Sequence, residues 1–232
     1  MTFLPIQRIK QPPNECEPTC LKQILDYFKI DSHLDDLIKR ISGDKFKWHN
    51  WDYNTGRVAI EHGLDVTIYT RSAGIFDPTW FELSAEDLLS KLKEEAEYFK
   101  TETYVGLPSF KEDIKAAIRF LESGGRINFT PISEKLIKEQ LDQHKPLIAG
   151  VSYTLLVNAP RERYFTKEKR WKPDDIKGQP YGHVVVICGY KDDSYQIADP
   201  WPQAEDKYNV IGTILLDAIL RNDSNLISFG KS

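Results

Sequence analysis

The chain is poor in sulfur-containing residues, with three cysteines and one methionine among 232 residues. Three cysteines are too few, and odd in number, for a disulfide framework. The histidines are scattered, and no second Cys/His pair with metal-ligand spacing accompanies Cys16 and Cys20. The sequence therefore predicts neither a disulfide scaffold nor a metal site.

Long apolar runs and an excess of one charge are also absent. No run approaches the roughly 20 apolar residues of a membrane helix, and the N-terminal residues lack the apolar core of a signal peptide. The formal net charge of −4 leaves no basic excess for nucleic acid or an anionic membrane. We expect a cytoplasmic protein that binds neither nucleic acid nor a membrane, unless a longer precursor was trimmed to make this chain. The oligomeric state stays open.

The composition, 41% hydrophobic and 28% charged, is that of a chain that buries a core. Helical periodicity and caps predict helices in the first part of the chain, at about 18–28, 34–41, 54–62, 84–100, 111–121 and 133–141. Strand patterns mostly follow later, at 66–69, 147–157, 184–187, 195–199 and 226–229, with a helix at 214–221. Helices dominate the first half and strands the second. This order predicts an α+β fold with an antiparallel sheet.

Cys16 stands at the start of the first predicted helix, two residues before Pro18. Proline suits the first helical turn. A helix N-terminus presents free backbone N–H groups and a partial positive charge, both of which stabilise a thiolate. The position predicts a nucleophile, but a small buried cysteine explains it equally well.

His183 opens an apolar strand directly after Tyr181 and Gly182. Asp199 ends the next strand, so a hairpin between the two strands brings both residues to one region. A carboxylate there accepts the second imidazole N–H and holds the tautomer that takes a proton from a thiol. Taken singly, His183 is better explained as a core histidine and Asp199 as a turn residue before Pro200.

Gln11 lies five residues before Cys16. A side-chain amide upstream of a nucleophile can donate a hydrogen bond to a developing oxyanion, alongside the Cys16 backbone N–H. One such donor is worth on the order of 3 kcal/mol in a transition state. A lone glutamine is otherwise an ordinary solvated loop residue.

Four segments together resemble a known family. Residues 11–21 (QPPNECEPTCL) resemble the Gln…Cys-Gly-x-x-x-Leu opening of the bacteriocin-processing, double-glycine-leader peptidases and their stand-alone relatives. Residues 182–190 (GHVVVICGY) look like the Gly-His-(apolar)-Gly-Tyr strand of that family, and residues 197–200 (IADP) like its apolar-x-Asp-Pro segment. Residues 141–148 (LDQHKPLI) are similar to the helix end and Pro-led strand that precede the histidine.

The resemblance implies a papain-like cysteine peptidase fold, with a helical N-terminal half packed on an antiparallel sheet. It implies a catalytic triad of Cys16, His183 and Asp199, an oxyanion-hole Gln11, a peptide or protein substrate, and no cofactor. Residues 1–232 would form a single domain with insertions near 72–125 and 158–182. Because no transporter segment is present, the exporter-linked role of known members does not carry over.

One departure from the family pattern lies beside the nucleophile. Glu17 replaces the glycine that usually follows the cysteine. A carboxylate there either raises the pKa of the thiol by like-charge repulsion or points into solvent. Glu17 is therefore the residue most able to change what this member does.

Aromatic residues outside the motifs are candidates for a substrate cleft. The stretch 48–53 is expected to be a loop that either lines the cleft or simply packs, and it supplies Trp48, His49 and Trp51. Trp201 follows the Asp199-Pro200 segment and is a further candidate. The charged, Pro/Gly-rich stretch 158–182 is expected to be an exposed loop or lid.

The remaining cysteines are interpreted as structural. Cys20 lies one turn inside the helix on its apolar stripe, and Cys188 takes the strand face opposite to His183. The sequence thus predicts a thiol hydrolase acting through Cys16. An amide (acyl) transferase with the same triad and a catalytically silent peptide-binding module remain as alternatives.

Overall fold

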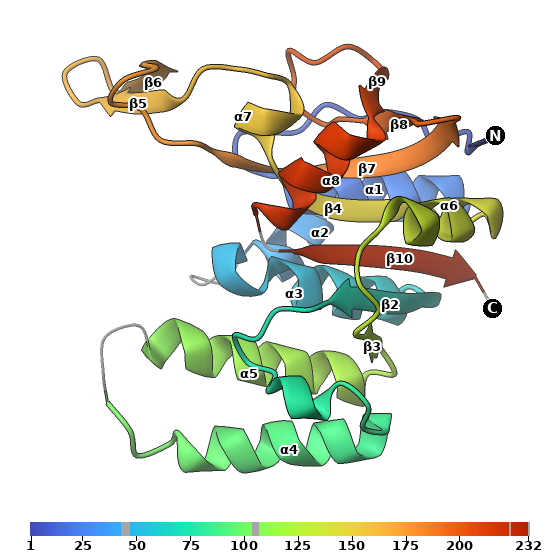
Figure 1. Ribbon diagram of the computed structural model, residues 1–232, viewed down its shortest axis with the longest axis vertical. Helices are drawn as coiled ribbons and strands as arrows, with labels where there is room; N and C mark the ends of the chain where they lie inside the picture. The colour runs from blue at the N-terminus through green and yellow to red at the C-terminus, as the bar shows by residue number, and fades with distance from the viewer. Residues whose placement is uncertain (43–46, 104–106, 223, 232) are drawn as a thin grey trace.

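The computed structural model describes residues 1–232 apart from 43–46, 104–106, 223 and 232, and the side chains of 47–49, 107 and 108 are likewise outside the description. A large mixed sheet forms its centre (Figure 1). The strands follow the order β3 (Arg126–Asn128), β2 (Leu64–Thr70), β10 (Asn225–Lys231), β4 (Leu147–Ser152), β7 (Gly182–Lys191), β8 (Ser194–Ala198) and β9 (Tyr208–Ile211), and β1 (Thr2–Phe3) pairs with β7.

Helices cover both faces of this sheet (Figure 1). One face carries α1 (Cys16–Tyr27), α2 (Leu34–Ile41) and α3 (Lys47–Glu61). The other carries α6 (Glu134–Asp142), α7 (Tyr153–Leu156) and α8 (Gly212–Leu220). A continuous apolar core runs between the layers and includes Leu21, Val185 and Phe229, each with no exposed surface.

The predicted α+β class is confirmed, and the sheet is antiparallel except for one pair. Strand β2 pairs with β3 in parallel, and β3 was not predicted because it is only three residues long. Strands β1 and β9 and the short 3-10 helix η1 (Pro78–Trp80) were also not predicted. Short elements of this kind carry too few residues to show a period.

Two predicted helix starts, near 84 and 133, are confirmed, and each follows a capping serine. The Ser84 hydroxyl accepts a hydrogen bond from the Asp87 backbone N–H at 3.1 Å, ahead of α4 (Ala85–Tyr98). The Ser133 hydroxyl accepts one from the Leu136 N–H at 3.2 Å, ahead of α6. Serine is favoured at this position because its side chain satisfies a backbone donor that the helix leaves free.

Three local predictions are wrong. The apolar run 147–157 is strand only to Ser152 and then turns into α7. The expected loop 158–182 contains a two-stranded hairpin of β5 (Glu162–Phe165) and β6 (Arg170–Pro173). The aromatic stretch 48–53 lies within α3, whose backbone departs from helical geometry at Asn50. Apolar runs do not distinguish strand from helix, and aromatic residues fit both.

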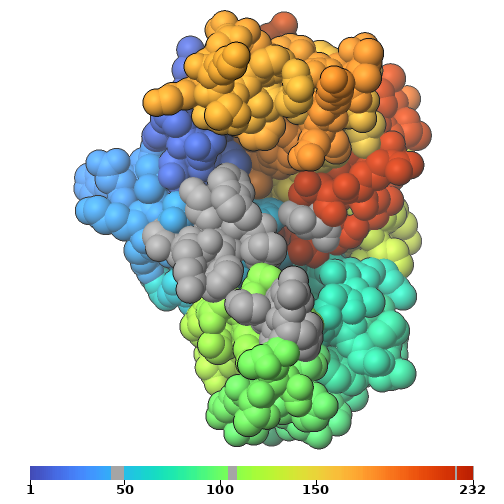
Figure 2. All heavy atoms as spheres, turned by 90° about the vertical axis from the view of Figure 1, so that its left-hand side faces the viewer, coloured from blue at the N-terminus to red at the C-terminus, as the bar shows by residue number. Residues whose placement is uncertain are grey.

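The segments around 72–125 and 158–182 lie at opposite ends of the molecule (Figures 1 and 2). The β5–β6 hairpin stands at one end, beyond α7 (Figure 1). Helices α4 and α5 (Leu107–Glu122) form the other end, where α5 packs on α3 through Phe120. Among the described helices, none has the length and apolar character needed to cross a membrane.

Candidate active site

The β7–β8 hairpin brings His183 and Asp199 together, as its strand order predicted. The strands pair antiparallel, with Val186 opposite Ala198, so Asp199 emerges beside the start of β7. Nε2 of His183 lies 2.7 Å from Oδ1 of Asp199, and both side chains are buried. This contact leaves Nδ1 of His183 as the ring nitrogen available to another partner.

Asp199 is held by two further donors. The Trp201 backbone N–H donates to Oδ1, and the Tyr208 hydroxyl donates to Oδ2, each at 2.8 Å. Burial alone raises the pKa of Asp199. The hydrogen bond and charge of His183, together with the hydrogen bonds from Trp201 and Tyr208, outweigh it and hold that pKa below its ordinary value. The carboxylate is therefore ionised at neutral pH and fixed in one orientation.

Cys16 is the first residue of α1, so the helix begins two residues earlier than predicted. Helix α1 packs against β7, where the Cys20 thiol donates to the Val184 carbonyl at 3.3 Å. This packing places Cys16 and His183 on the wall of one cavity of about 210 Å³. Its other described lining residues are Glu17, Trp51, Gly182, Val184 and Asn222.

Glu17 is buried, with 1% of its surface exposed, so it does not point into solvent. The Cys16 thiol donates to Oε2 of Glu17 at 3.5 Å. Burial raises the pKa of Cys16 well above its ordinary value, and the negative charge of Glu17 adds to the increase. A weaker opposing effect comes from the Val184 backbone. In this resting arrangement the thiol is protonated, despite its place at a helix N-terminus.

Aromatic rings surround the imidazole of His183. Tyr153 meets it edge-on, with ring centroids 4.9 Å apart, and Trp201 meets it edge-on at 5.7 Å. Trp51 lines the same cavity as Cys16. Trp201 is 38% exposed and adjoins His183 without being among the described lining residues. The side chains of Trp48 and His49 lie outside the described residues.

Gln11 is buried beside the Asp199 segment. Its backbone N–H donates to the Pro200 carbonyl at 2.8 Å. Its side-chain oxygen is buried and has no hydrogen-bond partner among the described residues. Gln11 is not among the described residues that line the Cys16 cavity.

Sequence reasoning missed several residues of the site. Tyr208 and Tyr153 come from β9 and α7, and no motif connects them with Asp199 or His183. Arg8 donates from Nε to the Asp199 carbonyl at 2.6 Å, and so links the N-terminal segment to the same turn. Asn222 reaches the Cys16 cavity from the segment after α8. Only tertiary packing brings these residues to the site.

The other cysteines are buried, as expected for structural residues. Cys20 and Cys188 have no exposed surface, and burial raises the pKa of each thiol. The Cys188 thiol lies 3.5 Å from the Gln196 carbonyl of the neighbouring strand. In the described parts of the chain, no group of three or more His, Cys, Asp or Glu side chains is arranged to hold a metal ion.

Comparison with known proteins gives one family match. The model of the Peptidase_C39 like family matches residues 3–215, which is most of the chain. The comparison with curated proteins finds no match.

Two solved structures are similar to this chain over its whole length. One is a double glycine motif protease from an AMS/PCAT transporter, crystallised in complex with the leader peptide, with 12% identity, 95% of that chain covered and a TM-score of 0.48. The other, from Bacillus anthracis, is described as a C39-like peptidase, with 14% identity, 98% of that chain covered and a TM-score of 0.50. The second likeness agrees with the papain-like fold predicted from the sequence.

Proposed function

Because the chain belongs to the Peptidase_C39 like family, we propose that it is a cysteine peptidase that hydrolyses a peptide or amide bond with Cys16 as nucleophile. The observation that carries the proposal is the placement of His183, which is bonded to Asp199 through Nε2 and lines the same cavity as Cys16. A nucleophile, a base and a group that orients the base are the parts that this chemistry requires.

The proposed reaction begins with transfer of the Cys16 thiol proton to Nδ1 of His183. The sulfur attacks the carbonyl carbon, and the C–O π electrons move to oxygen. When the tetrahedral intermediate collapses, the C–N bond breaks and His183 returns the proton to the leaving amine. Water, deprotonated by His183, then attacks the thioester and releases a carboxylic acid and the Cys16 thiol.

Asp199 orients His183 and stabilises the imidazolium formed in the first step. Its three hydrogen-bond donors keep it ionised, which is the state needed for that role. The Cys16 backbone N–H and the Gln11 side-chain amide are the proposed oxyanion donors. Gln11 follows from the family motif and from its burial next to the Asp199–Pro200 turn. The proposed substrate is a peptide or protein segment.

One observation favours a second function, a catalytically silent peptide-binding module. Glu17 accepts the thiol hydrogen and, together with burial, keeps the thiol protonated. A protonated thiol is a poor nucleophile. In a silent module this state would persist when peptide binds.

A peptide-library cleavage assay with Cys16→Ala tests the proposal. The wild-type protein is expected to cleave a subset of the library, and Cys16→Ala to lose at least roughly a thousandfold in rate, because the nucleophile is gone. The matched control is Cys188→Ala, another buried cysteine, which should retain activity. Cleavage that persists in Cys16→Ala contradicts the proposal. If the wild-type protein binds peptides without cleaving them, the protein is instead the silent peptide-binding module. If an added amine becomes incorporated into the product, the protein is an acyl transferase.

A further inference from the structure

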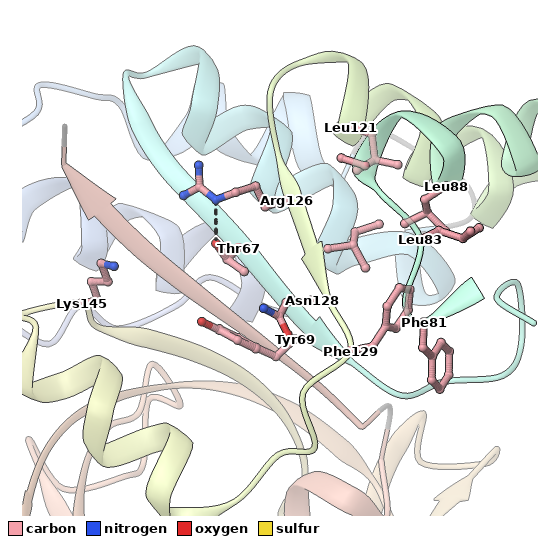
Figure 3. Close-up of a pocket in the computed structure, with 12 residues that line it drawn as sticks. Thr67, Tyr69, Phe81, Leu83, Leu88, Leu121, Arg126, Asn128, Phe129 and Lys145 are labelled. Atoms are coloured by element: carbon pink, nitrogen blue, oxygen red, sulfur yellow. Dashed lines mark hydrogen bonds between the residues drawn. The ribbon is translucent and has the colours of Figure 1, made fainter. Parts of the chain in front are cut away.

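A second cavity, of about 520 Å³, lies at the β3 edge of the sheet (Figure 3). Its floor is the parallel pair β2–β3, in which Thr67 is opposite Arg126 and Tyr69 opposite Asn128. The neighbouring Val66 of β2 is buried against α3. Side chains alternate along a strand, so Thr67 and Tyr69 lie on the opposite face. This floor therefore belongs to the sheet face that α3 does not cover.

One end of the cavity is cationic. Arg126 donates from Nε to the Thr67 hydroxyl at 3.3 Å, and Lys145 enters from the connection between α6 and β4 (Figure 3). Within the described parts of the chain, neither cation forms an ion pair with a carboxylate. The described lining contains no acidic residue, although the chain carries a net charge of −4. It consists of Thr67, Tyr69, Phe81, Leu83, Ala85, Leu88, Leu121, Arg126, Ile127, Asn128, Phe129 and Lys145.

Two neutral donors stand beside the cations. Burial raises the pKa of Tyr69, so its hydroxyl stays protonated at neutral pH; Arg126 lowers this pKa and Glu139 raises it, each by less. Glu139 lies outside the lining and forms an ion pair with Lys135 at 3.8 Å. Oδ1 of Asn128 already accepts from the Thr130 N–H at 2.8 Å, so the amide of Asn128 offers its N–H groups.

The other end of the cavity is apolar, and neighbouring contacts hold its aromatic rings in place. Phe81 stacks on Phe129 with ring centroids 4.4 Å apart and 15° between the planes. Arg71 lies over the Phe81 ring at 4.8 Å and donates to the Phe129 carbonyl at 3.3 Å. Leu83 and Leu88 complete this wall (Figure 3). The wall thus offers a fixed aromatic surface for an apolar group.

We propose that this cavity binds a soluble organic anion that carries an apolar arm. The anionic group, a carboxylate or phosphate, accepts hydrogen bonds at the Arg126 and Lys145 end, and the arm lies against Phe81 and Phe129. Charge-assisted hydrogen bonds to a guanidinium hold the anion in place. Burial of the apolar arm removes its surface from water, which also favours binding. Binding here is separate from the chemistry at Cys16 and stands whether or not the protein is a peptidase.

Isothermal titration calorimetry with decanoate tests the site, with acetate and decyltrimethylammonium as comparison ligands. Decanoate carries both the anion and the arm, acetate only the anion, and decyltrimethylammonium the arm with reversed charge. The test variant is Arg126→Gln with Lys145→Gln. The matched control is Arg170→Gln with Lys172→Gln, which removes the same two charges from the β5–β6 hairpin at the other end of the molecule.

Wild type and the control variant are expected to bind decanoate at one saturable site, and acetate and decyltrimethylammonium much more weakly. The Arg126/Lys145 variant should lose about tenfold or more in affinity, because each hydrogen bond to a charged group contributes roughly that factor. Equal affinity in both double variants overturns the proposal, as does equal binding of decanoate and decyltrimethylammonium. Binding confined to phosphatidylglycerol vesicles also overturns it. Far-UV circular dichroism confirms that the variants fold, and the single substitutions replace the double if it does not.

Discussion

At the scale of single residues, burial and the adjacent Glu17 together set the protonation state of the proposed nucleophile. A helix N-terminus ordinarily lowers the pKa of a thiol. Here burial and the adjacent carboxylate act in the opposite direction, and they prevail. Cys16 therefore has the position of an activated cysteine and the resting protonation state of an inactive one.

Replacing Glu17 with glutamine or glycine is expected to accelerate alkylation of Cys16 by iodoacetamide at neutral pH. Loss of the negative charge lowers the pKa of the thiol, and the thiolate fraction rises by about tenfold for each unit of decrease while the pKa stays above the working pH. Mass spectrometry of the Cys16 peptide measures the rate. Asp26→Asn, which removes a carboxylate from the far end of α1, is the control and should leave the rate unchanged. A wild-type rate in Glu17→Gln would mean that burial alone suppresses the thiol.

Tyr208 is a proposed positioning residue for the same site. Its hydroxyl donates to Oδ2 of Asp199, and that hydrogen bond helps to lower the pKa of the carboxyl. Tyr208→Phe should therefore raise the pKa of Asp199 and shift the acid limb of the activity profile to higher pH. The expected loss in kcat is on the order of tenfold, the worth of one hydrogen bond to a charged group.

The control for this substitution is Tyr190→Phe, which also removes a hydroxyl bonded to an aspartate, at Asp142 away from the site. It should leave both the rate and the pH profile of peptide cleavage unchanged. A Tyr208→Phe protein with an unshifted acid limb would show that Asp199 is held well enough by His183 and Trp201.

At the scale of elements, α5 packs closely on α3. Gly56 of α3 faces Phe120 of α5, and a Cβ atom at Gly56 would lie 2.6 Å from Cε2 of the ring. Tyr53 packs against the same ring, with centroids 6.2 Å apart. Phe120 itself has no exposed surface. The helix needs a residue without a side chain at this point.

Gly56→Ala is expected to destabilise the protein by about 1–3 kcal/mol, the usual cost of overpacking a core. On an exposed helix the same change would stabilise by up to about 1 kcal/mol, so the sign distinguishes the two effects. Urea unfolding measures the free energy. In a double-mutant cycle, Phe120→Leu should relieve part of the cost in the Gly56→Ala background. A neutral or stabilising Gly56→Ala would show that the Phe120 ring moves aside freely.

At the scale of the whole molecule, the two ends of the chain contribute unequally to the sheet. The C-terminal strand β10 lies in the middle, bonded to β2 on one side and β4 on the other. Its residues Leu226, Ile227 and Phe229 have no exposed surface. At the other terminus, β1 forms a two-residue pair with the end of β7. Strand β10 is therefore an interior strand of the sheet, and β1 is a peripheral one.

Deleting the chain from Asn225 onward is expected to abolish folding. The deletion removes a central strand and several fully buried side chains, each worth about 1.5–3 kcal/mol, against a total stability of roughly 5–15 kcal/mol. Far-UV circular dichroism and thermal unfolding measure the effect. Deletion of residues 1–3 is the control and should preserve a cooperative transition. A folded protein without β10 would mean that β2 and β4 can pair without it.

The sequence by itself determined the elements with a clear period or cap and the hairpin that joins His183 to Asp199. These features are local, because helix periods, Ser84 and Ser133 caps and strand order depend on neighbouring residues. The sequence did not decide the ends of short elements, the helical state of 48–53 or the hairpin inside 158–182, since local patterns there fit more than one structure. It also left two outcomes open for Glu17. Only the tertiary structure decided between them, because the burial of Glu17 arises when distant segments pack over the start of α1.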